Sequence, residues 1–527
     1  MVDAAEVPEG GSARHDRRTV LRLLGLGGLS TLVACAADHH NVLVSDGAVA
    51  PTIPPTASTP STASSRPTAV VTTSLAPPPT TTLAPPAAAP YDPTRPFWVQ
   101  GNFAPVARET EAFDLAVVGA LPADLDGLYV RNGPNAFGGG GRWLLGDGMV
   151  HGVRLGQGAA AWYRNRFVHT AVLGGADPGG APGSGDIANT SNTSVRAIAG
   201  RLLSLQETGQ PYELDQSTFD TIGAWNAHGQ LGPTLTAHPK IDPGTGRIHA
   251  FATQTRPPYL TYLVFEPNGN LAHREVVNVR NPTMIHDFAI TDRDVVFFEL
   301  PAVYSIDDAV NRPGTMPYRW QPDVGARIGV MPLDGRATDL RWVDIEPCYV
   351  VHATNAWREG SDVVLDVSRL PSVLSDGMTD GPSTGGDLRR WRIGTGAAAL
   401  TWRQEVLVDR PFDLPTIRPD SVGRPHAAAF YVTTRAAPGG WEYAGIARLE
   451  PRSGSVDAWD APAHLSAGEP LVVGLHVLTF VFDRTTASSV LAVFLADHIS
   501  DGPIATVALP QRVPCGQHGT WLPGGVA

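Results

Sequence analysis

Residues 248–269 read IHAFATQTRPPYLTYLVFEPNG, and this stretch decides the fold class. It contains two short apolar runs, Ile248–Thr253 and Leu260–Phe265, and it ends in the turn signal Pro267-Asn268-Gly269. Short runs with β-branched and aromatic side chains, bounded by Pro, Gly and Asn, are typical of β-strands rather than helices. The stretch therefore predicts two consecutive short strands followed by a tight turn.

The same pattern recurs throughout the chain after Tyr91. Further short runs of this kind are Gly127–Arg131, Gly152–Leu155, Leu202–Leu205, Asp294–Glu299, Asp362–Asp366, Ala428–Thr433 and Val490–Leu495. Turn signals separate them, and Ser305–Val310 fits a short helix or a loop cap. Many short strands joined by tight turns predict an all-β body over residues 91–527, as a sandwich, a barrel or a propeller. A propeller suits a body of this length, because each added blade extends a ring without enlarging one core.

Composition and charge limit the classes of function. Apolar residues make up 43% of the 527 residues and charged residues 17%, which is enough to bury a sizeable core. The net charge of −12 comes without a basic run, which argues against a nucleic-acid partner. No clear repeat of ~40–45 residues is visible, which argues against a WD40 or kelch array. The three cysteines, Cys35, Cys348 and Cys515, are too few for a disulfide framework.

Residues 1–35 have the features of a targeting segment. Arg17-Arg18 precede a weakly apolar run over residues 23–34, which is too short to span a bilayer at ~1.5 Å per residue. The twin arginines resemble a Tat signal, and Leu32-Val33-Ala34-Cys35 resembles a bacterial lipobox, in which the cysteine is acylated. An ordinary N-terminal anchor helix is the alternative. We therefore expect Tat export and attachment to the membrane surface through lipidated Cys35, at the outer face of the cytoplasmic membrane.

Residues 36–90 form a Pro-, Thr- and Ala-rich linker. From Gly47 to Pro90, Arg66 is the only charged residue. A segment of this composition cannot offset its ordering entropy by burial, so we expect an extended, disordered spacer. An interaction tail is the alternative.

Four of the sixteen histidines stand in unusual local contexts, namely His238, His286, His352 and His518. They lie so far apart in the chain that one helix or hairpin cannot hold them together. A propeller can, because the inner strands of different blades point at one axis. Neutral imidazoles suit Fe, Zn, Cu or Ni, and composition does not choose among these metals. Each histidine by itself would more often be a satisfied core or loop histidine than a ligand.

Several motifs together resemble the carotenoid cleavage oxygenase family. The N-terminal part of the body resembles it in Gly101–Val106, Leu128–Asn135, Gly146–His151 and Tyr163–Phe167. Four histidine motifs follow in the family's order: Ala237-His238-Pro239-Lys240, His286-Asp287-Phe288, His352-Ala353-Thr354-Asn355-Ala356-Trp357 and His518-Gly519-Thr520-Trp521. The resemblance covers residues 97–523, and four motifs in order are far more specific than one.

The resemblance implies an all-β, seven-bladed β-propeller with capping loops and short helices over its iron-bearing face. It implies one Fe(II) per chain on the propeller axis. The metal-binding and catalytic residues would be His238, His286, His352 and His518, without a carboxylate among the direct ligands. This differs from sites in which two histidines and one carboxylate hold the iron.

The family also supplies three glutamates that hold the outer ring nitrogens of these histidines. Glu207 and Glu469 match two of them, whereas the family's Glu-Phe-Pro is replaced here by Asp413-Leu414-Pro415, one methylene shorter. We expect Asp413 to take this role through a shifted backbone or a bridging water, and plain surface charge is the alternative for all three. The segment Leu471–Gly474 departs from the family and puts the local blade geometry in doubt. His151 resembles a structural position rather than a ligand.

By resemblance, the chain is a non-haem Fe(II) dioxygenase that cleaves a C=C bond of a conjugated apolar substrate with O₂, giving carbonyl products. Carotenoids and apocarotenoids are the first choice of substrate. A stilbene is the alternative, because Tyr163-Arg164-Asn165-Arg166 resembles the stilbene-cleaving branch. That branch holds the phenol with a Tyr and a Lys, and the only lysine here, Lys240, stands beside His238. A binding propeller without catalysis is the alternative of another class.

Overall fold

The computed structural model describes residues 91–136, 143–173, 189–312, 316–373, 386–437 and 440–524. The predicted signal peptide with Cys35 and the predicted linker lie outside these residues and stay predictions. Among the residues that are described, no helix is long and apolar enough to cross a membrane.

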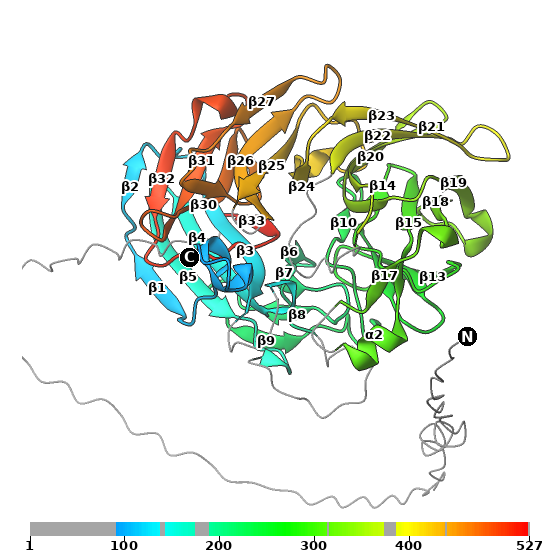
Figure 1. Cartoon of the computed structure of the whole chain (residues 1–527), viewed down its shortest axis with the longest axis horizontal. Helices are drawn as coiled ribbons and strands as arrows, with labels where there is room; N and C mark the ends of the chain where they lie inside the picture. Colours follow the sequence, from blue (N-terminus) through cyan, green and yellow to red (C-terminus); the bar gives the residue numbers. More distant parts are fainter. Residues whose placement is uncertain are drawn as a thin grey trace, which may run out of the picture. The chain divides into compact units, whose positions relative to one another are not determined.

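Seven antiparallel sheets of four or more strands follow one another around a ring in the described residues (Figure 1). The all-β, seven-bladed propeller is therefore confirmed. We number the blades in ring order and give their strands from the inner edge outward. Blade 1 consists of β33 (Gly519–Pro523), β3 (Gly127–Asn135), β4 (Asp147–Gly156), β5 (Ala159–Phe167) and β1 (Thr110–Phe113). Blade 2 consists of β6 (Ser194–Ile198), β7 (Arg201–Leu205), β8 (Tyr212–Leu214) and β9 (Thr221–Ala224).

The next three blades carry most of the middle of the chain. Blade 3 consists of β10 (Lys240–Ile241), β11 (Ile248–Thr253), β12 (Leu260–Phe265) and β13 (Leu271–Val277). Blade 4 consists of β14 (Ala289–Ile290), β15 (Asp294–Glu299), β18 (Ala326–Pro332) and β19 (Arg341–Ile345). Blade 5 consists of β20 (Tyr349–Glu359), β21 (Asp362–Leu370), β22 (Asp387–Gly394) and β23 (Thr401–Val408).

The last two blades complete the ring. Blade 6 consists of β24 (Phe412–Thr416), β25 (Ala429–Ala437), β26 (Gly440–Leu449) and β27 (Val456–Trp459). Blade 7 consists of β28 (Leu465–Ala467), β29 (Leu471–Val473), β30 (His476–Asp483), β31 (Ser488–Leu495), β32 (Ala505–Ala508) and β2 (Val117–Gly119).

Two strand pairings close the ring between its first and last segments. The C-terminal β33 pairs with β3, so that Gly127 stands opposite Pro523. The N-terminal β2 pairs with β32 at the outer edge of blade 7, with Val117 opposite Val507. Because both ends of the body are tied into sheets that they share, the ring is held closed by backbone hydrogen bonds as well as by packing.

Seven clusters of buried apolar side chains lie between the blades, one between each pair of neighbouring blades. Strand β11 shows how the sequence encodes this. Its Ile248 and Ala250 pack toward blade 2, whereas Phe251 packs toward blade 4. Successive side chains of a strand point to opposite faces of the sheet, and in a propeller both faces are covered. The run therefore reads as almost continuously apolar rather than alternating.

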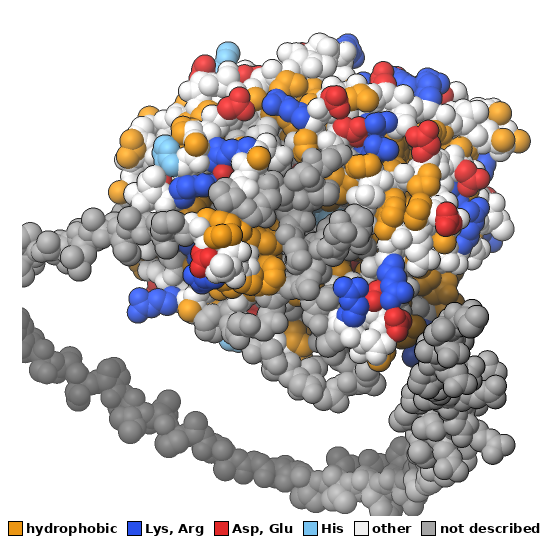
Figure 2. Space-filling model, viewed as in Figure 1, with side chains coloured by type: hydrophobic (Ala, Val, Ile, Leu, Met, Phe, Trp, Pro, Cys, Tyr) orange, Lys and Arg blue, Asp and Glu red, His pale blue; other side chains and the backbone are white. Residues whose placement is uncertain are grey.

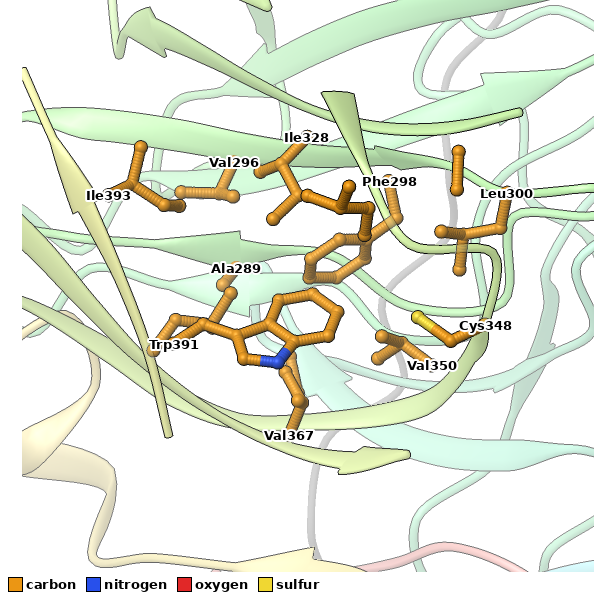
Figure 3. Close-up of a cluster of buried hydrophobic side chains, with 14 of the residues drawn as sticks. Ala289, Val296, Phe298, Leu300, Ile328, Cys348, Val350, Val367, Trp391 and Ile393 are labelled. Atoms are coloured by element: carbon orange, nitrogen blue, oxygen red, sulfur yellow. The ribbon is translucent and has the colours of Figure 1, made fainter. Parts of the chain in front are cut away.

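Figure 3 shows the cluster between blades 4 and 5. Phe298 of β15 and Trp391 of β22 meet edge to face, with ring centroids 6.1 Å apart. Cys348 lies in the same cluster as a free thiol, whose pKa is raised by burial to about 11. Cys515 is also free and buried, so no disulfide joins these two cysteines. Both act as small apolar side chains.

Helices are few and short in the described part of the chain. Helix α2 (Ile306–Asn311) begins after Ser305, whose hydroxyl accepts from the backbone N–H of Asp308, and it follows β16 (Ala302–Tyr304), which pairs with β17 (Tyr318–Trp320). The 3₁₀ helices are η1 (Phe97–Val99), η2 (Gly101–Phe103), η3 (Trp143–Leu145), η5 (Pro322–Val324), η6 (Ala337–Asp339), η8 (Pro419–Ser421) and η9 (Ile499–Asp501). Side chains of η1, η2 and η3 pack with Leu414 and Cys515, close to two of the predicted site residues. On the face shown in Figure 2, acidic and basic side chains are interspersed.

Candidate metal centre

Each of the four predicted histidines stands at or just before the innermost strand of its blade. His238 precedes β10, His286 precedes β14, His352 lies on β20 and His518 directly precedes β33. The inner strands surround the axis of the ring, so four blades each bring one imidazole to the same place. The structure thus brings together residues that are widely separated in the sequence.

The imidazole nitrogens of these four residues form a compact group. All four ligand nitrogens lie within 4.8 Å of one another. The Nε2 atoms of His238 and His286 are 3.1 Å apart, those of His286 and His352 are 3.2 Å apart, and those of His352 and His518 are 3.1 Å apart. Two nitrogens bound at ~2.1 Å to one metal ion and at right angles would be ~3 Å apart. The spacing therefore suits ligands of a single ion.

The three predicted acids hold the opposite nitrogens of three of these rings. The Nδ1 atom of His286 lies 2.5 Å from Glu207, that of His352 lies 2.6 Å from Asp413, and that of His518 lies 2.7 Å from Glu469. Among the described residues, His238 has no carboxylate partner of this kind. Glu207, Asp413 and Glu469 belong to blades 2, 6 and 7, which carry no ligand histidine. All seven blades therefore contribute one group to the centre.

Burial largely determines the protonation states of His238, His518 and Glu469. Burial and the neighbouring imidazoles lower the pKa of His238 and of His518 well below the usual value, so both rings are neutral. Burial also raises the pKa of Glu469 to about 7, although the positive charge of Arg196 opposes this. Arg196 donates to the carbonyl of Gly519 at 2.8 Å, which keeps its charge near the site.

In the His286–Glu207 pair, the pKa values shift in the opposite directions to those of His518 and Glu469. Burial opposes ionisation of Glu207, but the charge of His286 and its hydrogen bond outweigh burial and lower the pKa of the carboxyl. Burial likewise opposes the charged form of His286, but the charge of Glu207 and the same hydrogen bond raise its pKa. Asp413 behaves like Glu207, because His352 outweighs burial and lowers the pKa of the carboxyl.

The arrangement calls for a cation at the point where the rings meet. When the rings are neutral and Glu207, Asp413 and Glu469 each accept a hydrogen bond from an Nδ1–H, the Nε2 atoms of the same rings carry lone pairs. Lone pairs that face one another at 3.1–3.2 Å repel unless a cation lies between them. Four neutral nitrogen donors suit a divalent transition metal and are a poor match for Ca²⁺ or Mg²⁺. The fold and the site thus define a metal-dependent β-propeller.

Asp413 reaches His352 directly despite its shorter side chain. Strand β24 shifts its register against β25 between Asp413 and Thr416. Leu414 has a φ of 48°, in the left-handed region that L-residues seldom adopt. Oδ1 of Asp413 lies 2.6 Å from His352 Nδ1, so the contact needs no bridging water.

The surroundings of His518 explain why a glycine follows it in the sequence. Gly519 donates its N–H to Glu469 at 2.7 Å, and a Cβ at Gly519 would lie 2.6 Å from the carbonyl oxygen of Val130. A side chain therefore does not fit after His518.

The segment Leu471–Gly474, which departs from the family, forms β29 and a turn into β30 at Gly474. Blade 7 is intact despite this departure.

Other residues near the centre were not predicted or have structural roles. His151 hydrogen-bonds through Nδ1 to the hydroxyl of Tyr163 at 2.8 Å, away from the four ligands, as expected for a structural histidine. Sequence reasoning missed Arg196, and it missed the ion pair between Lys240 and Asp287, whose atoms are 2.7 Å apart. The sequence contained a signal for this ion pair, because Lys240 and Asp287 both belong to the histidine motifs.

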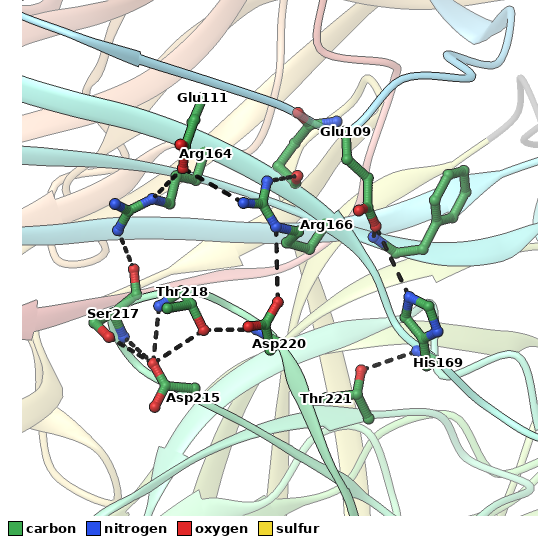
Figure 4. Close-up of polar contacts among 12 residues, drawn as sticks. Glu109, Glu111, Arg164, Arg166, His169, Asp215, Ser217, Thr218, Asp220 and Thr221 are labelled. Carbon is green, nitrogen blue, oxygen red and sulfur yellow. Dashed lines mark hydrogen bonds and ion pairs between the residues drawn. The ribbon is translucent and has the colours of Figure 1, made fainter.

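The motif that resembles the stilbene branch holds strands together. Arg164 and Arg166 of β5 both contact Glu111 of β1, and Arg166 also contacts Asp220 of the neighbouring blade (Figure 4). Asn165 donates to the backbone of Arg108 at 2.9 Å. These contacts tie the outer strand and blade 2 to β5, and they give this motif a structural role.

Comparison with known proteins identifies the family. The family model described as retinal pigment epithelial membrane protein matches residues 103–523. A protein of Mycobacterium tuberculosis named carotenoid cleavage oxygenase is 35% identical over 500 residues, covering 81% of this chain and 97% of that protein. A carotenoid 9,10(9',10')-cleavage dioxygenase 1 of Arabidopsis thaliana is 31% identical over 493 residues, covering 81% and 89%. The chain belongs to the carotenoid cleavage oxygenase family, as its motifs predicted.

Solved structures agree with this assignment. The lignostilbene dioxygenase of Pseudomonas brassicacearum superposes with a TM-score of 0.75 at 28% identity, covering 83% of this chain and all of that one. A cobalt-substituted apocarotenoid oxygenase of Synechocystis superposes with a TM-score of 0.70 at 26% identity, covering 80% and 97%. Both are oxygenases on a similar propeller.

Proposed function

We propose that this protein is a non-haem iron dioxygenase that holds one Fe(II) per chain and cleaves a C=C bond of a carotenoid or an apocarotenoid. The observation that carries the proposal is the convergence of four imidazoles, three of them held by carboxylates, within 4.8 Å. The names of the relatives support the substrate class. A binding propeller without catalysis would be expected to lack a ligand, and all four histidines are present.

The chain's own residues position the metal ligands and shield the centre; they do not transfer protons. Cleavage of a C=C bond by O₂ into two carbonyl groups places both oxygen atoms in the products and needs no proton from the protein. Bound iron would supply the activation of O₂. Glu207, Asp413 and Glu469 keep the Nε2 lone pairs directed at the centre. Leu414 and Cys515, next to Asp413 and near His518, are buried in an apolar cluster beside the centre.

The test is a product assay with defined metal content. The protein is loaded with Fe(II) without oxygen, its iron is measured by elemental analysis, and it is then incubated in air with a carotenoid, an apocarotenal and a hydroxystilbene. We expect about one iron per chain and aldehydes from a carotenoid-type substrate, each carrying label from ¹⁸O₂. Iron-loaded protein that releases no aldehyde from any of the three would overturn the proposal.

A stilbene is the second candidate substrate, because the Pseudomonas brassicacearum structure that superposes is a lignostilbene dioxygenase. Two observations weigh against it. The only lysine, Lys240, is ion-paired with Asp287 and is not available to hold a phenol. Arg164 and Arg166 of the stilbene-like motif bind neighbouring strands. Aldehydes from the hydroxystilbene alone would reverse the order of the two candidates.

We also propose that the protein is exported by the Tat route and anchored through lipidated Cys35. The support is the sequence alone, with Arg17-Arg18 before a short apolar run and a lipobox at its end. Tat export carries folded proteins, so iron could be bound before export. That order would protect the site from copper and zinc, which bind nitrogen ligands more tightly than Fe(II) does. Cys35→Ala should move the protein from the membrane fraction to a soluble one, and an unchanged distribution would contradict the anchor.

A further inference from the structure

Asp287 is a buried carboxylate that contacts none of the four imidazoles but binds the chain beside three of them. Its side chain is only 2% exposed. Oδ1 accepts from the Lys240 ammonium at 2.7 Å and from the backbone N–H of Phe288 at 2.8 Å. Oδ2 accepts from the backbone N–H of Ala353 at 2.8 Å. Both oxygens are therefore used, by three segments of the chain.

These three segments carry three of the predicted ligands and come from three blades. Lys240 follows His238 by two residues in blade 3, Asp287 itself follows His286 in blade 4, and Ala353 follows His352 in blade 5. A single carboxylate thus fixes the distances between neighbouring inner strands at the level of the metal centre. The fourth ligand segment is held in another way, because the backbone N–H of His518 donates to Thr193 of blade 2 at 3.2 Å.

We propose that Asp287, together with Lys240, is a positioning residue that holds His238, His286 and His352 in the geometry that binds the metal. The inference rests on the proposed metal centre but not on the choice of substrate. It differs from the role of Glu207, Asp413 and Glu469, because those acids orient single rings, whereas Asp287 sets the spacing between blades.

The chemistry of the pair supports this role over a purely stabilising one. A buried ion pair contributes little net stability, because desolvation offsets most of its attraction, and apolar replacements are often as stable. What such a pair does provide is a fixed arrangement with directional bonds. The ammonium of Lys240 also lies 5.9 Å from the centre of the Phe288 ring, which keeps the lysine against blade 4.

The test uses Co(II) as a visible probe of the site. Metal-free protein is titrated with Co(II), the absorption bands report the coordination geometry, and competition with a chelator gives the affinity. We expect Asp287→Asn to weaken Co(II) binding about 10- to 100-fold, as loss of supporting contacts around a metal site does, and to change the band positions. Lys240→Met should weaken binding less, and the double variant should be no worse than Asp287→Asn, because both remove one interaction.

A matched control is the buried pair of Asp366 and Arg390 within blade 5. Its atoms are 2.8 and 2.9 Å apart, and it is not adjacent to any of the four histidines. Asp366→Asn should lower the melting temperature of the metal-free protein while leaving Co(II) affinity and spectrum unchanged. If Asp287→Asn fails to fold, Lys240→Met carries the test alone.

Three outcomes would overturn the inference. Asp287→Asn and Lys240→Met could bind Co(II) with the parent's affinity and spectrum. Asp366→Asn could weaken Co(II) binding as much as Asp287→Asn does, which would show a general effect of stability. Parent protein that binds no Co(II) would overturn the proposed metal centre itself, and with it this inference. A parent that binds Co(II) but yields no aldehyde with iron would leave the positioning role standing and remove only the proposed reaction.

Discussion

Two histidine–carboxylate pairs at the same centre differ in their exposure to solvent. On the closed side, the side chains of His518 and Glu469 are 4% and 2% exposed. On the open side, those of His286 and Glu207 are 21% and 22% exposed. The hydrogen bond is the same in both pairs, but the pKa of Glu469 is raised to about 7, mainly by burial, whereas that of Glu207 is lowered. Burial opposes ionisation of both carboxylates, and the comparison teaches that the charge of the partner imidazole decides whether that opposition is overcome.

A functional division follows from this difference. On the closed side, burial makes Glu469 costly to ionise, and the positive charge of a bound metal would offset that cost. On the open side, the larger exposure of His286 and Glu207 shows that solvent reaches this part of the centre. We expect the closed side to anchor the metal and the open side to face the reaction.

Removal of a ligand on the closed side should have the largest effect. His518→Ala leaves the buried Glu469 without its partner, so we expect loss of bound iron and a fall in product formation of at least about 100-fold, since metal ligands cannot be replaced by water in a closed site. His286→Ala should retain more metal, because water can take its place. Iron analysis and aldehyde yield measure both. His169, which is 66% exposed and contacts Glu109 and Thr221 (Figure 4), supplies the control His169→Ala. Equal metal loss in the two ligand variants would remove the distinction between the sides.

The next largest effect concerns pH and the metal-free protein. Glu469 has a pKa of about 7 when folded, whereas an unfolded glutamate titrates near ~4.3. Between these values the folded state keeps a proton that the unfolded state has released. Stability from this group is therefore full below about pH 4 and falls as pH rises to about 7, by at most ~4 kcal/mol at ~1.4 kcal/mol per pKa unit.

Glu469→Gln should abolish this slope. Urea unfolding of the metal-free parent and variant across this pH range measures the difference in free energy of unfolding, in which the contributions of the other groups cancel. We expect the free energy of unfolding of the variant to increase relative to that of the parent as pH rises. A difference that does not depend on pH would contradict the raised pKa.

Metal affinity should distinguish the two carboxylates by a smaller margin. Glu469→Gln is expected to weaken Co(II) binding about 10- to 100-fold, the usual range for such supporting groups. Glu207→Gln should weaken binding less, because the side chain of His286 is 21% exposed and water can replace the lost acceptor. Chelator competition measures both variants. A larger loss for Glu207→Gln would reverse the assignment of the anchoring side.

The smallest effect should come from Asp413→Glu, which restores the residue found in the family. Asp413 already contacts His352 directly, and strand β24 has a backbone shift just after it. One extra methylene in this fitted position crowds the ring, so we expect metal affinity to fall by less than about tenfold, in line with the cost of mild overpacking. Titration with Co(II) measures the change. Tighter binding would show that the backbone shift is not adapted to aspartate.

Much of the fold could be predicted from local patterns, and some strand ends could not. Ile248–Thr253 and Leu260–Phe265 were predicted with the observed bounds, because both faces of these strands are buried and their composition shows it. The predicted Gly127–Arg131 continues to Asn135 as β3, through Gly133 and Pro134, which locally read as a turn. Pairing of Pro134 with Gly148 on β4 overrides that local signal. The two-residue β14 is too short to have a pattern of its own.

The sequence by itself determined the chemistry of the centre: four imidazoles, three carboxylates, and the family to which their motifs belong. Only the tertiary structure decided which carboxylate holds which ring, which side is open, and that Asp287 joins three blades. The physical reason is that strand patterns record burial within a few residues. Contacts between blades depend instead on how inner strands far apart in the chain line up around the axis, and short-range patterns do not encode that alignment.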